Sequence, residues 1–382
     1  MGRVRLQQSG GPPGRARLAA LAGAVALLSL LAACAPASTP TGGAASQPAA
    51  STGGQTAGGA GQAAPAPQGN GQTYTMKFGF ATLNDVQHEF ANRLKERVEA
   101  QSNGRLKIEV YPASQLGNNQ RMIEGVQLGT QEATIQPPEF VFGVDPRYVV
   151  LSLPYLFDSV DEANKVLGTP VVDQLINVGE SKGLKGLSVI QYGFAGILGH
   201  NQVRTPDDLR GKKIRVLGSQ IELDTLSSWG ATGVPMALSE VGPGLQQKTV
   251  DGVIQAPQTY LAFKYHEIAK YYSATQHYVI TSIFLVNKGW YDRLPPDLQK
   301  LLSDQAKGLQ NEMSQFSDDK NAESLKITRE TPGDEVIELT PQQLSAFKAT
   351  APGVWDKYLQ STPDARPLLE GLQNEVKKVR AQ

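Results

Sequence analysis

The sequence has only one cysteine and four histidines among its 382 residues. Cys34 therefore cannot form an intramolecular disulfide, and a zinc site built from several cysteines is excluded. Lysine plus arginine and aspartate plus glutamate balance at 36 each, so the basic excess typical of nucleic-acid binding is missing. The mean hydropathy of −0.28 excludes a protein made mostly of membrane-spanning helices.

Catalytic motifs are scarce as well. His266 and Glu267 would begin a zinc-protease helix only if position 270 were histidine, but it is Lys270. A Gly-x-Ser-x-Gly elbow is missing, and the Gly-Lys-Lys segment at 211–213 lacks the other residues of a phosphate loop. We interpret His266 as an ordinary helix residue. We expect no enzyme, no catalytic residue, no cofactor and no metal site.

The first 33 residues have the pattern of an export signal. Four arginines at positions 3–17 precede an uncharged apolar stretch of 14 residues at 18–31, and small residues lead to Cys34. A spanning helix needs about 20 apolar residues, so this stretch is short for a membrane anchor. An uncleaved anchor is the less favoured alternative. Without these residues the chain would carry 32 basic against 36 acidic residues, which makes it mildly acidic.

The Leu-Ala-Ala-Cys segment that ends at Cys34 resembles the lipobox of bacterial lipoproteins, in which the cysteine is lipidated and becomes the new first residue. This resemblance implies a membrane tether outside the cytoplasm, since paired acyl chains hold a protein stably to a bilayer. The alternative is a free buried cysteine, but its neighbours could not form a core. Residues 35–73 contain only Ala, Ser, Thr, Gly, Pro, Gln and Asn, which predicts a flexible linker.

Residues 74–382 alternate strands with amphipathic helices, which predicts an α/β fold with largely parallel sheets. We expect strands at 75–80, 106–111, 133–136 and 187–192. A stripe of Val86, Phe90, Leu94 and Val98 predicts a helix that Gly104 can end. Further helices are expected near 119–128, after Ser159 and after Pro170.

Two helix starts are marked by capping patterns in the second half of the body. Thr205 and Thr340 each precede a proline, with a carboxylate or an amide three residues further on. Between them, apolar residues from Leu298 to Phe316 predict one long helix that begins after two prolines at 295–296. The sequence shows no repeat of 20 to 50 residues, and two lobes are more plausible than one.

Arg215 is the most suggestive charged residue. Ile214 and Val216 point to one face of a short expected strand and Arg215 points to the other. In open α/β sheets the carboxyl end of a strand borders the ligand crevice, and a guanidinium matches a carboxylate with two parallel hydrogen bonds. On spacing alone, an ordinary surface arginine is the more common alternative.

From residue 74 to about residue 369 the chain resembles the solute-binding proteins of tripartite ATP-independent periplasmic (TRAP) transporters. Ordered segments carry this resemblance: YPASQLG at 111–117, LGT at 128–130, LPYLF at 153–157, TPDDLRGKKIRV at 205–216, VPM at 234–236, SEV at 239–241 and VDG at 250–252. The segment at 205–216 is the most specific of them.

The resemblance implies a two-lobed periplasmic-binding-protein-like α/β fold with a hinge, crossing strands and a long connecting helix. It implies residues 74–192 plus 281–320 as lobe I and 193–280 plus 321–382 as lobe II, after a signal peptide at 1–33 and a lipidated linker at 34–73. Arg215 falls on the position of the family's carboxylate-binding arginine. Gln255 and Gln136 fall on cleft positions, although both amides could instead cap backbone groups.

Two departures from the family pattern limit the expected ligand. Ala195 stands where dicarboxylate and sialic acid binders often carry a second arginine. Gly242 and Gly244 replace a tyrosine and an alanine, which would remove bulk beside the cleft. We therefore expect a monocarboxylate, or a keto or hydroxy acid, in preference to a dicarboxylate.

The resemblance also implies partners and a location. The chain is expected to act outside the cytoplasm, tethered through Cys34, and to deliver a small organic acid to TRAP membrane subunits, with no role in nucleic-acid binding. Two alternatives remain open at this point. One is a lipid-anchored binding component of an ATP-driven importer or a sensor, and the other, less favoured, is a lipoprotein enzyme.

Overall fold

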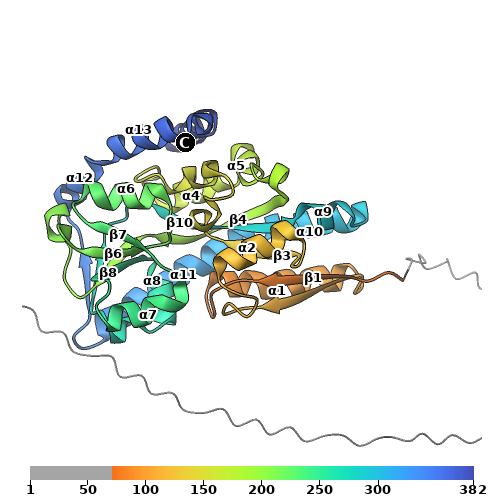
Figure 1. The fold of residues 1–382 in the computed structure, drawn as a ribbon, viewed down its shortest axis with the longest axis horizontal. Coiled ribbons are helices and arrows are strands. Elements are labelled where there is room, and N and C mark those ends of the chain that lie inside the picture. Colours follow the sequence, from red (N-terminus) through yellow and green to blue (C-terminus); the bar gives the residue numbers. More distant parts are fainter. Residues whose placement is uncertain (1–70) are drawn as a thin grey trace, which may run out of the picture. The chain divides into compact units, whose positions relative to one another are not determined.

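The computed structural model describes residues 71–382. The predicted signal peptide, Cys34 and nearly all of the predicted linker lie outside the described residues. The described chain is one compact unit with two β-sheets and helices around them (Figure 1). Within this part of the chain, none of the helices combines the length and the apolar character needed to cross a membrane.

The first sheet has five strands in the order β2-β1-β3-β10-β4. The bounds are β1 (Tyr74–Gly79), β2 (Leu106–Tyr111), β3 (Ala133–Gln136), β4 (Leu184–Phe194) and β10 (Val279–Asn287). The strand β1 pairs in parallel with β2 and β3, whereas β10 runs antiparallel to β3 and β4. The carboxyl ends of β1 and β3 therefore lie at the same edge of this sheet.

The second sheet has six strands in the order β11-β9-β5-β8-β6-β7. The bounds are β5 (Gly196–Gly199), β6 (Lys213–Val216), β7 (Thr232–Pro235), β8 (Gly252–Gln255), β9 (Tyr271–Ala274) and β11 (Glu335–Glu338). The strand β6 is parallel to β7 and β8, while β5 is antiparallel to β8 and β9. The strand β11 is parallel to β9, so five of the nine strand pairings within residues 71–382 are parallel. The expectation of largely parallel sheets holds only in part, because β10 and β5 form antiparallel pairs and both sheets are mixed.

Three segments join the two sheets. The strand β4 of the first sheet leads into β5 of the second, and β9 of the second leads into β10 of the first. The third segment is the helix α11 (Gln310–Glu330), whose 21 residues extend for about 32 Å. This helix packs against β4 of the first sheet and against β11 of the second. The crossing strands and the connecting helix of the predicted two-lobed fold are confirmed.

The other helices cover the two sheets and the C-terminal side of the molecule. Those before β4 are α1 (Val86–Gln101), α2 (Asn119–Leu128), α3 (Pro138–Val141), α4 (Val160–Leu167) and α5 (Pro170–Ile176). Those that follow are α6 (Gln220–Ser228), α7 (Leu238–Gln246), α8 (Pro257–Ala262), α9 (Lys288–Asp292), α10 (Pro296–Gly308), α12 (Pro341–Lys348), α13 (Ala351–Ser361) and α14 (Arg366–Arg380).

Helix α1 illustrates how local sequence sets the fold. Asp85 caps its first turn by accepting hydrogen bonds from the backbone amides of Gln87 and His88. The predicted apolar stripe is fully buried, and Phe90 packs edge-on against Phe78 of β1 with ring centroids 6.4 Å apart. The helix ends at Gln101, and the left-handed residues that follow the cap residue Ser102 are Asn103 (φ +53°) and Gly104 (φ +73°), so the predicted left-handed end is present but begins at Asn103.

Two helix predictions need correction. The capping box at Thr205 is present, with Asp208 as its carboxylate, but it opens only a single 3₁₀ turn at Pro206–Leu209. The single long helix expected after the prolines at 295–296 is two helices, α10 and α11, which separate at Leu309. Gly308 immediately precedes this break, and glycine has a low helix propensity.

The C-terminal helices contact parts of both lobes. Helix α13 packs against α6, and the Trp355 indole donates to the carbonyl oxygen of Pro154 at 2.9 Å. Helix α14 packs against α4 and α5, as the blue helices in Figure 1 show, and Arg380 forms a salt bridge with Glu162 at 2.7 Å. The predicted second lobe included residues 321–382, which contain these helices. The division of the chain into lobes stays a prediction.

Candidate functional site

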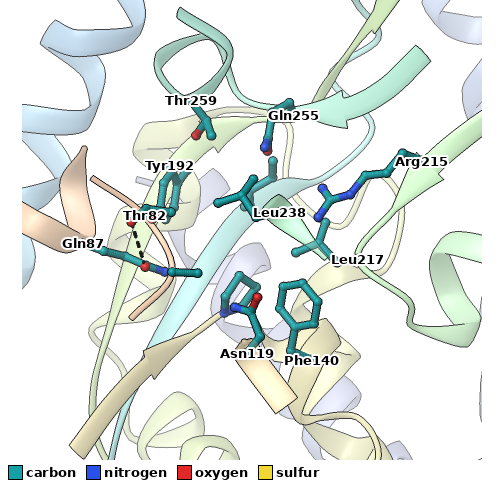
Figure 2. A pocket seen from close by; sticks show the side chains of 13 residues that line it. Thr82, Gln87, Asn119, Phe140, Tyr192, Arg215, Leu217, Leu238, Gln255 and Thr259 are labelled. Atoms are coloured by element: carbon teal, nitrogen blue, oxygen red, sulfur yellow. Dashed lines mark hydrogen bonds between the residues drawn. The ribbon is translucent and has the colours of Figure 1, made fainter. Parts of the chain in front are cut away.

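A cavity lies where the carboxyl ends of parallel strands from both sheets meet. Its walls follow β1 and β3 in the first sheet, β6 and β8 in the second, and the crossing strands β4 and β10. The cavity enclosed by these walls has a volume of about 40 Å³. Its lining comprises Ala81, Thr82, Gln87, Asn119, Pro137, Phe140, Tyr192, Arg215, Leu217, Leu238, Gln255, Thr259 and Ile280 (Figure 2).

Arg215 lies near the carboxyl end of β6 and is directed into this cavity, toward Leu217 and Leu238 (Figure 2). Its side chain is 1% exposed, which excludes the alternative of an ordinary surface arginine. The Nε and Nη2 atoms donate to the carbonyl oxygen of Met236 at 3.0 and 2.9 Å. A guanidinium has five N–H donors, so three remain, two on Nη1 and one on Nη2.

Two buried carboxyl groups act electrostatically on this guanidinium. Burial lowers the pKa of Arg215, and the charge of Glu222 is the largest contribution that opposes this shift, with a smaller one from Glu139 where that group is ionised. Glu222 accepts hydrogen bonds from the backbone amides at 217–219, at distances of 2.9 to 3.1 Å. None of the acids within residues 71–382 forms a salt bridge with Arg215. Its positive charge therefore lacks a direct partner.

Glu139 is the second buried acid, at the N-terminal end of α3. Burial, reinforced by the charge of Glu222, raises the pKa of Glu139 to about 8. The hydroxyl of Ser152 is hydrogen-bonded to its Oε1, while Oε2 has no partner among the described residues. Glu139 is therefore the carboxyl group that holds a proton at neutral pH, and Arg215 is incompletely neutralised.

Gln255 ends β8 on the same sheet as Arg215. Arg215 pairs in parallel with Val253, and Gln255 follows two residues later, so Arg215 and Gln255 lie on one face of the sheet. Gln255 lines the cavity at 7% exposure, and its amide makes no side-chain hydrogen bond within residues 71–382. The structure thus brings two of the three predicted binding residues together.

Gln136 occupies a different place. It ends β3, is fully buried and is not among the residues that line the cavity. Its Oε1 accepts from Asn119 Nδ2 at 2.7 Å, and its Nε2 donates to Thr134 Oγ1 at 2.7 Å. Gln136 therefore orients Asn119, which does line the cavity.

Sequence reasoning missed several lining residues. Asn119 starts α2 only two residues after the YPASQLG segment, so that segment could have indicated it. Phe140 follows the two prolines at the end of β3, while Thr259 follows the equivalent Pro257 after β8. In the segment at 134–138 and again in the segment at 253–257, a glutamine ends a strand just before a helix that begins with proline. This shared pattern could have indicated that both segments contribute walls to one cavity.

The residues that limited the ligand prediction lie close to this region. Ala195 is fully buried between β4 and β5. Gly242 and Gly244 are in α7, where a Cβ would meet Tyr265 at 3.7 Å and Met236 at 3.1 Å. In the described residues no group of three or more His, Cys, Asp or Glu side chains could hold a metal ion.

Comparison with known proteins identifies a family and several relatives to which this chain is similar. Residues 79–362 match the family model of bacterial extracellular solute-binding proteins, family 7. The chain is 30% identical over 301 residues to the 2,3-diketo-L-gulonate-binding periplasmic protein YiaO of Escherichia coli, covering 78% of this chain and 91% of that protein. It is 28% identical over 276 residues to the C4-dicarboxylate-binding periplasmic protein DctP of Rhodobacter capsulatus, covering 70% and 80%.

Solved structures show the same fold. A TRAP periplasmic solute-binding protein from a Sulfitobacter species with bound β-D-galacturonate aligns with a TM-score of 0.74 at 26% identity, covering 79% of this chain and all of that one. A sugar acid binding protein of Advenella mimigardefordensis in complex with galactonate aligns with a TM-score of 0.76 at 25% identity, covering 80% and 99%.

The chain belongs to the family of bacterial extracellular solute-binding proteins, family 7, which serve TRAP transporters. Members of this family bind solutes and are not enzymes, so the alternative of a lipoprotein enzyme is removed. The family also implies a location outside the cytoplasm. The two-lobed α/β fold predicted from the sequence is confirmed.

Proposed function

We propose that the chain captures a small organic acid in the cavity between its lobes and delivers it to the membrane subunits of a TRAP transporter. The observation that carries this proposal is Arg215, a buried guanidinium that lines the cavity and keeps three donors free of the protein. The ligands named for the relatives, diketogulonate, C4-dicarboxylates and galacturonate, are all organic acids. A carboxylate can accept two parallel hydrogen bonds from such a fork.

Within this proposal the three predicted residues have distinct roles. Arg215 binds the carboxylate of the ligand. Gln255, on the same face of the second sheet, contacts an oxygen beside that carboxylate through its amide. Gln136 acts from behind the first-lobe wall, because it fixes the amide of Asn119 through the 2.7 Å hydrogen bond. Each of the three residues lies at or next to the end of its strand, which is β6, β8 or β3.

Hinge closure is the proposed mechanism. Within residues 71–382, the β4–β5 and β9–β10 connections and α11 are the segments that join the two sheets directly, and a small rotation about such connections opens or closes a cleft. An open cleft admits the hydrated anion. Closure then excludes water, and the attraction between the carboxylate and Arg215 becomes stronger because the local dielectric constant falls.

We further propose that lipidated Cys34 tethers the mature chain to a membrane and that residues 35–73 link the anchor to the binding body. The support is the Leu-Ala-Ala-Cys segment after a charged and then apolar N-terminus. Residues 35–73 contain no charged, aromatic or branched aliphatic side chain other than threonine, which is the composition of a linker.

A thermal-shift screen of organic acids tests the proposed ligand class. An acid that binds only the folded protein stabilises it by about 2.7 kcal/mol at 100 times its dissociation constant, which raises the melting temperature measurably. The amide of the same acid, which lacks the negative charge, is expected to give no shift. A screen in which neutral sugars stabilise the protein and organic acids do not would contradict the proposal.

A further inference from the structure

The polar groups of the cavity fall into two sets, and each member of the first set already makes a hydrogen bond within the protein. The Thr82 hydroxyl lies 2.8 Å from Asp85 Oδ1 and 3.0 Å from Gln87 Oε1, the contact drawn as a dashed line in Figure 2. The remaining members donate to protein oxygens: Gln87 to Ser282 at 3.0 Å, Asn119 to Gln136 at 2.7 Å and Tyr192 to Asp85 at 3.0 Å.

The second set is open to a ligand. It consists of the three remaining donors of Arg215, the Gln255 amide and the Thr259 hydroxyl. Among residues 71–382, the side chains of Gln255 and Thr259 have no hydrogen-bond partner in the protein, although both line the cavity. These residues come from β6, β8 and α8, all on the second-lobe side. This second set is therefore gathered at the second-lobe end of the cavity.

The remaining walls are apolar. They consist of Ala81, Pro137, Phe140, Leu217, Leu238 and Ile280. Phe140 and Pro137 come from the first lobe, Leu217 and Leu238 from the second, and Ile280 from the crossing strand β10. Figure 2 shows Phe140, Leu217 and Leu238 grouped beside the Arg215 guanidinium. On the first-lobe side, Asn119 keeps its amide oxygen and one N–H, because only its other N–H is donated to Gln136.

We infer that the ligand is a monocarboxylate with one oxygen beside the carboxylate, as in a 2-oxo or 2-hydroxy acid, and an apolar aliphatic or aromatic body. This inference rests on the proposed function and specifies its ligand. The carboxylate takes the Arg215 donors, and the neighbouring oxygen takes Gln255 or Thr259. The body of the acid contacts Phe140, Leu217 and Leu238, where burial of apolar surface is favourable.

A polyhydroxy acid fits this cavity poorly. A hexuronate carries several hydroxyl groups along its body, and each hydroxyl that is buried without a partner weakens binding by about tenfold. The hydroxyl donors of Thr82 and Tyr192 are already used, and Gln87 and Asn119 each keep only one N–H, so the first-lobe side can pair with only some of these hydroxyls. A C4-dicarboxylate is equally disfavoured, because the described cavity lining contains Arg215 as its single cationic residue and a second carboxylate would be buried unpaired.

Calorimetry on the purified full chain tests this assignment. The apolar acids are phenylpyruvate and 4-methyl-2-oxopentanoate, and the polar comparison acids are D-galacturonate and succinate. We expect either apolar acid to bind at least 50-fold more tightly than both polar acids. Tighter binding of galacturonate or succinate would overturn the inference and leave the proposed capture of an organic acid standing. Failure of every acid to bind would overturn both.

Two variants locate the apolar wall. Leu238→Asn, which keeps the size of the side chain but adds an amide, should weaken phenylpyruvate binding about tenfold and change pyruvate binding less than threefold. The same substitution at Leu128, which is 80% exposed and outside the cavity lining, is the matched control and should change neither. If Leu238→Asn fails to fold, Phe140→Leu should weaken phenylpyruvate more than 4-methyl-2-oxopentanoate. Equal losses for long and short acids would overturn the assignment of this wall.

Discussion

Arg215 and Met236 are held together by two hydrogen bonds, because Nε and Nη2 of the arginine both donate to the carbonyl oxygen of the methionine. The backbone amide of Met236 in turn donates to the carbonyl oxygen of Val216, at 3.2 Å. The guanidinium is thus fixed by the backbone of the neighbouring strand end. Its Nη1 edge is left facing the cavity, and no side-chain rearrangement is needed to present it to a carboxylate.

The stability of the protein should fall as pH rises from 5 to 8, through Glu139. The folded state holds the proton of this carboxyl up to a pKa of about 8, whereas an unfolded glutamate releases it near 4.5. The folded state therefore binds more protons in this window. Relative to Glu139→Gln, the free energy of unfolding should fall by about 3 kcal/mol over this range.

Denaturant unfolding of both proteins at pH 5, 6, 7 and 8 measures this difference. Glu139→Gln preserves the size of the side chain and an oxygen that can accept from Ser152, so it isolates the ionisation. Parallel pH profiles for the two proteins would show that Glu139 is not the titrating group.

His277 should act in the opposite direction and at lower pH. Burial lowers its pKa to about 3, compared with 6.5 in an unfolded chain. Its Nδ1 is hydrogen-bonded to Thr275 at 2.8 Å, and Nε2 has no partner in the described chain. The unfolded state therefore binds more protons below pH 6.5, and stability is lost as pH falls.

The unfolding free energy of the wild type, relative to His277→Gln, should drop by about 2 kcal/mol between pH 7 and pH 5. The variant cannot take up the proton, so the comparison removes the opposing contribution of Glu139. A relative loss below 0.5 kcal/mol, on the order of ordinary surface effects, would mean that His277 is not buried in its neutral form.

Gly193 lies at a point of the crossing strand β4 that only glycine occupies without strain. Its φ is +91°, and a Cβ would lie 2.4 Å from Asn321 Nδ2, which donates to Tyr192 O at 2.6 Å. Gly193→Ala should destabilise the protein by about 2 to 5 kcal/mol, since backbone strain and overpacking add. Gly104→Ala, at φ +73° with open space around it, should cost only about 1 to 2 kcal/mol. Equal losses of stability in Gly193→Ala and Gly104→Ala would show that Asn321 of α11 does not pack closely against Gly193.

The membrane tether is tested by Cys34→Ser. The wild-type chain should sediment with the membrane fraction of expressing cells, and the variant should not, because serine cannot carry the acyl chains. Immunoblotting of separated fractions measures the distribution, and organic acid binding by the variant serves as the control for correct folding. Retention of Cys34→Ser in the membrane would favour an uncleaved apolar anchor.

The sequence predicted those features that depend on local periodicity and on short motifs. The α1 stripe from Val86 to Val98 and the strand at 106–111 were recognisable because burial alternates with the period of each element. The spacing of Ile214 and Val216 placed Arg215 on the other face of β6, but on spacing alone a surface arginine was the more common alternative. The resemblance at 205–216 is what pointed to Arg215 as a cleft residue. These elements need no knowledge of distant contacts.

Features that depend on tertiary contacts were not predictable in the same way. The sequence placed Gln136 in the cleft. In the structure its side chain is instead hydrogen-bonded to Asn119, which lies on a different element. The engagement of Tyr192 by Asp85 joins residues 107 positions apart. The apolar character of the cavity therefore became visible only when the side chains of both lobes were placed.

Binding of an organic acid by Arg215→Ala tests the account most directly. Removing one member of a buried, hydrogen-bonded charge pair costs about 2 to 5 kcal/mol, so the dissociation constant should rise by roughly 30-fold to several thousand-fold. Arg215→Lys keeps the charge but loses the fork, and it should recover only part of the affinity. Calorimetry with an acid that stabilises the wild type would contradict the account if Arg215→Ala bound it within threefold of the wild-type affinity.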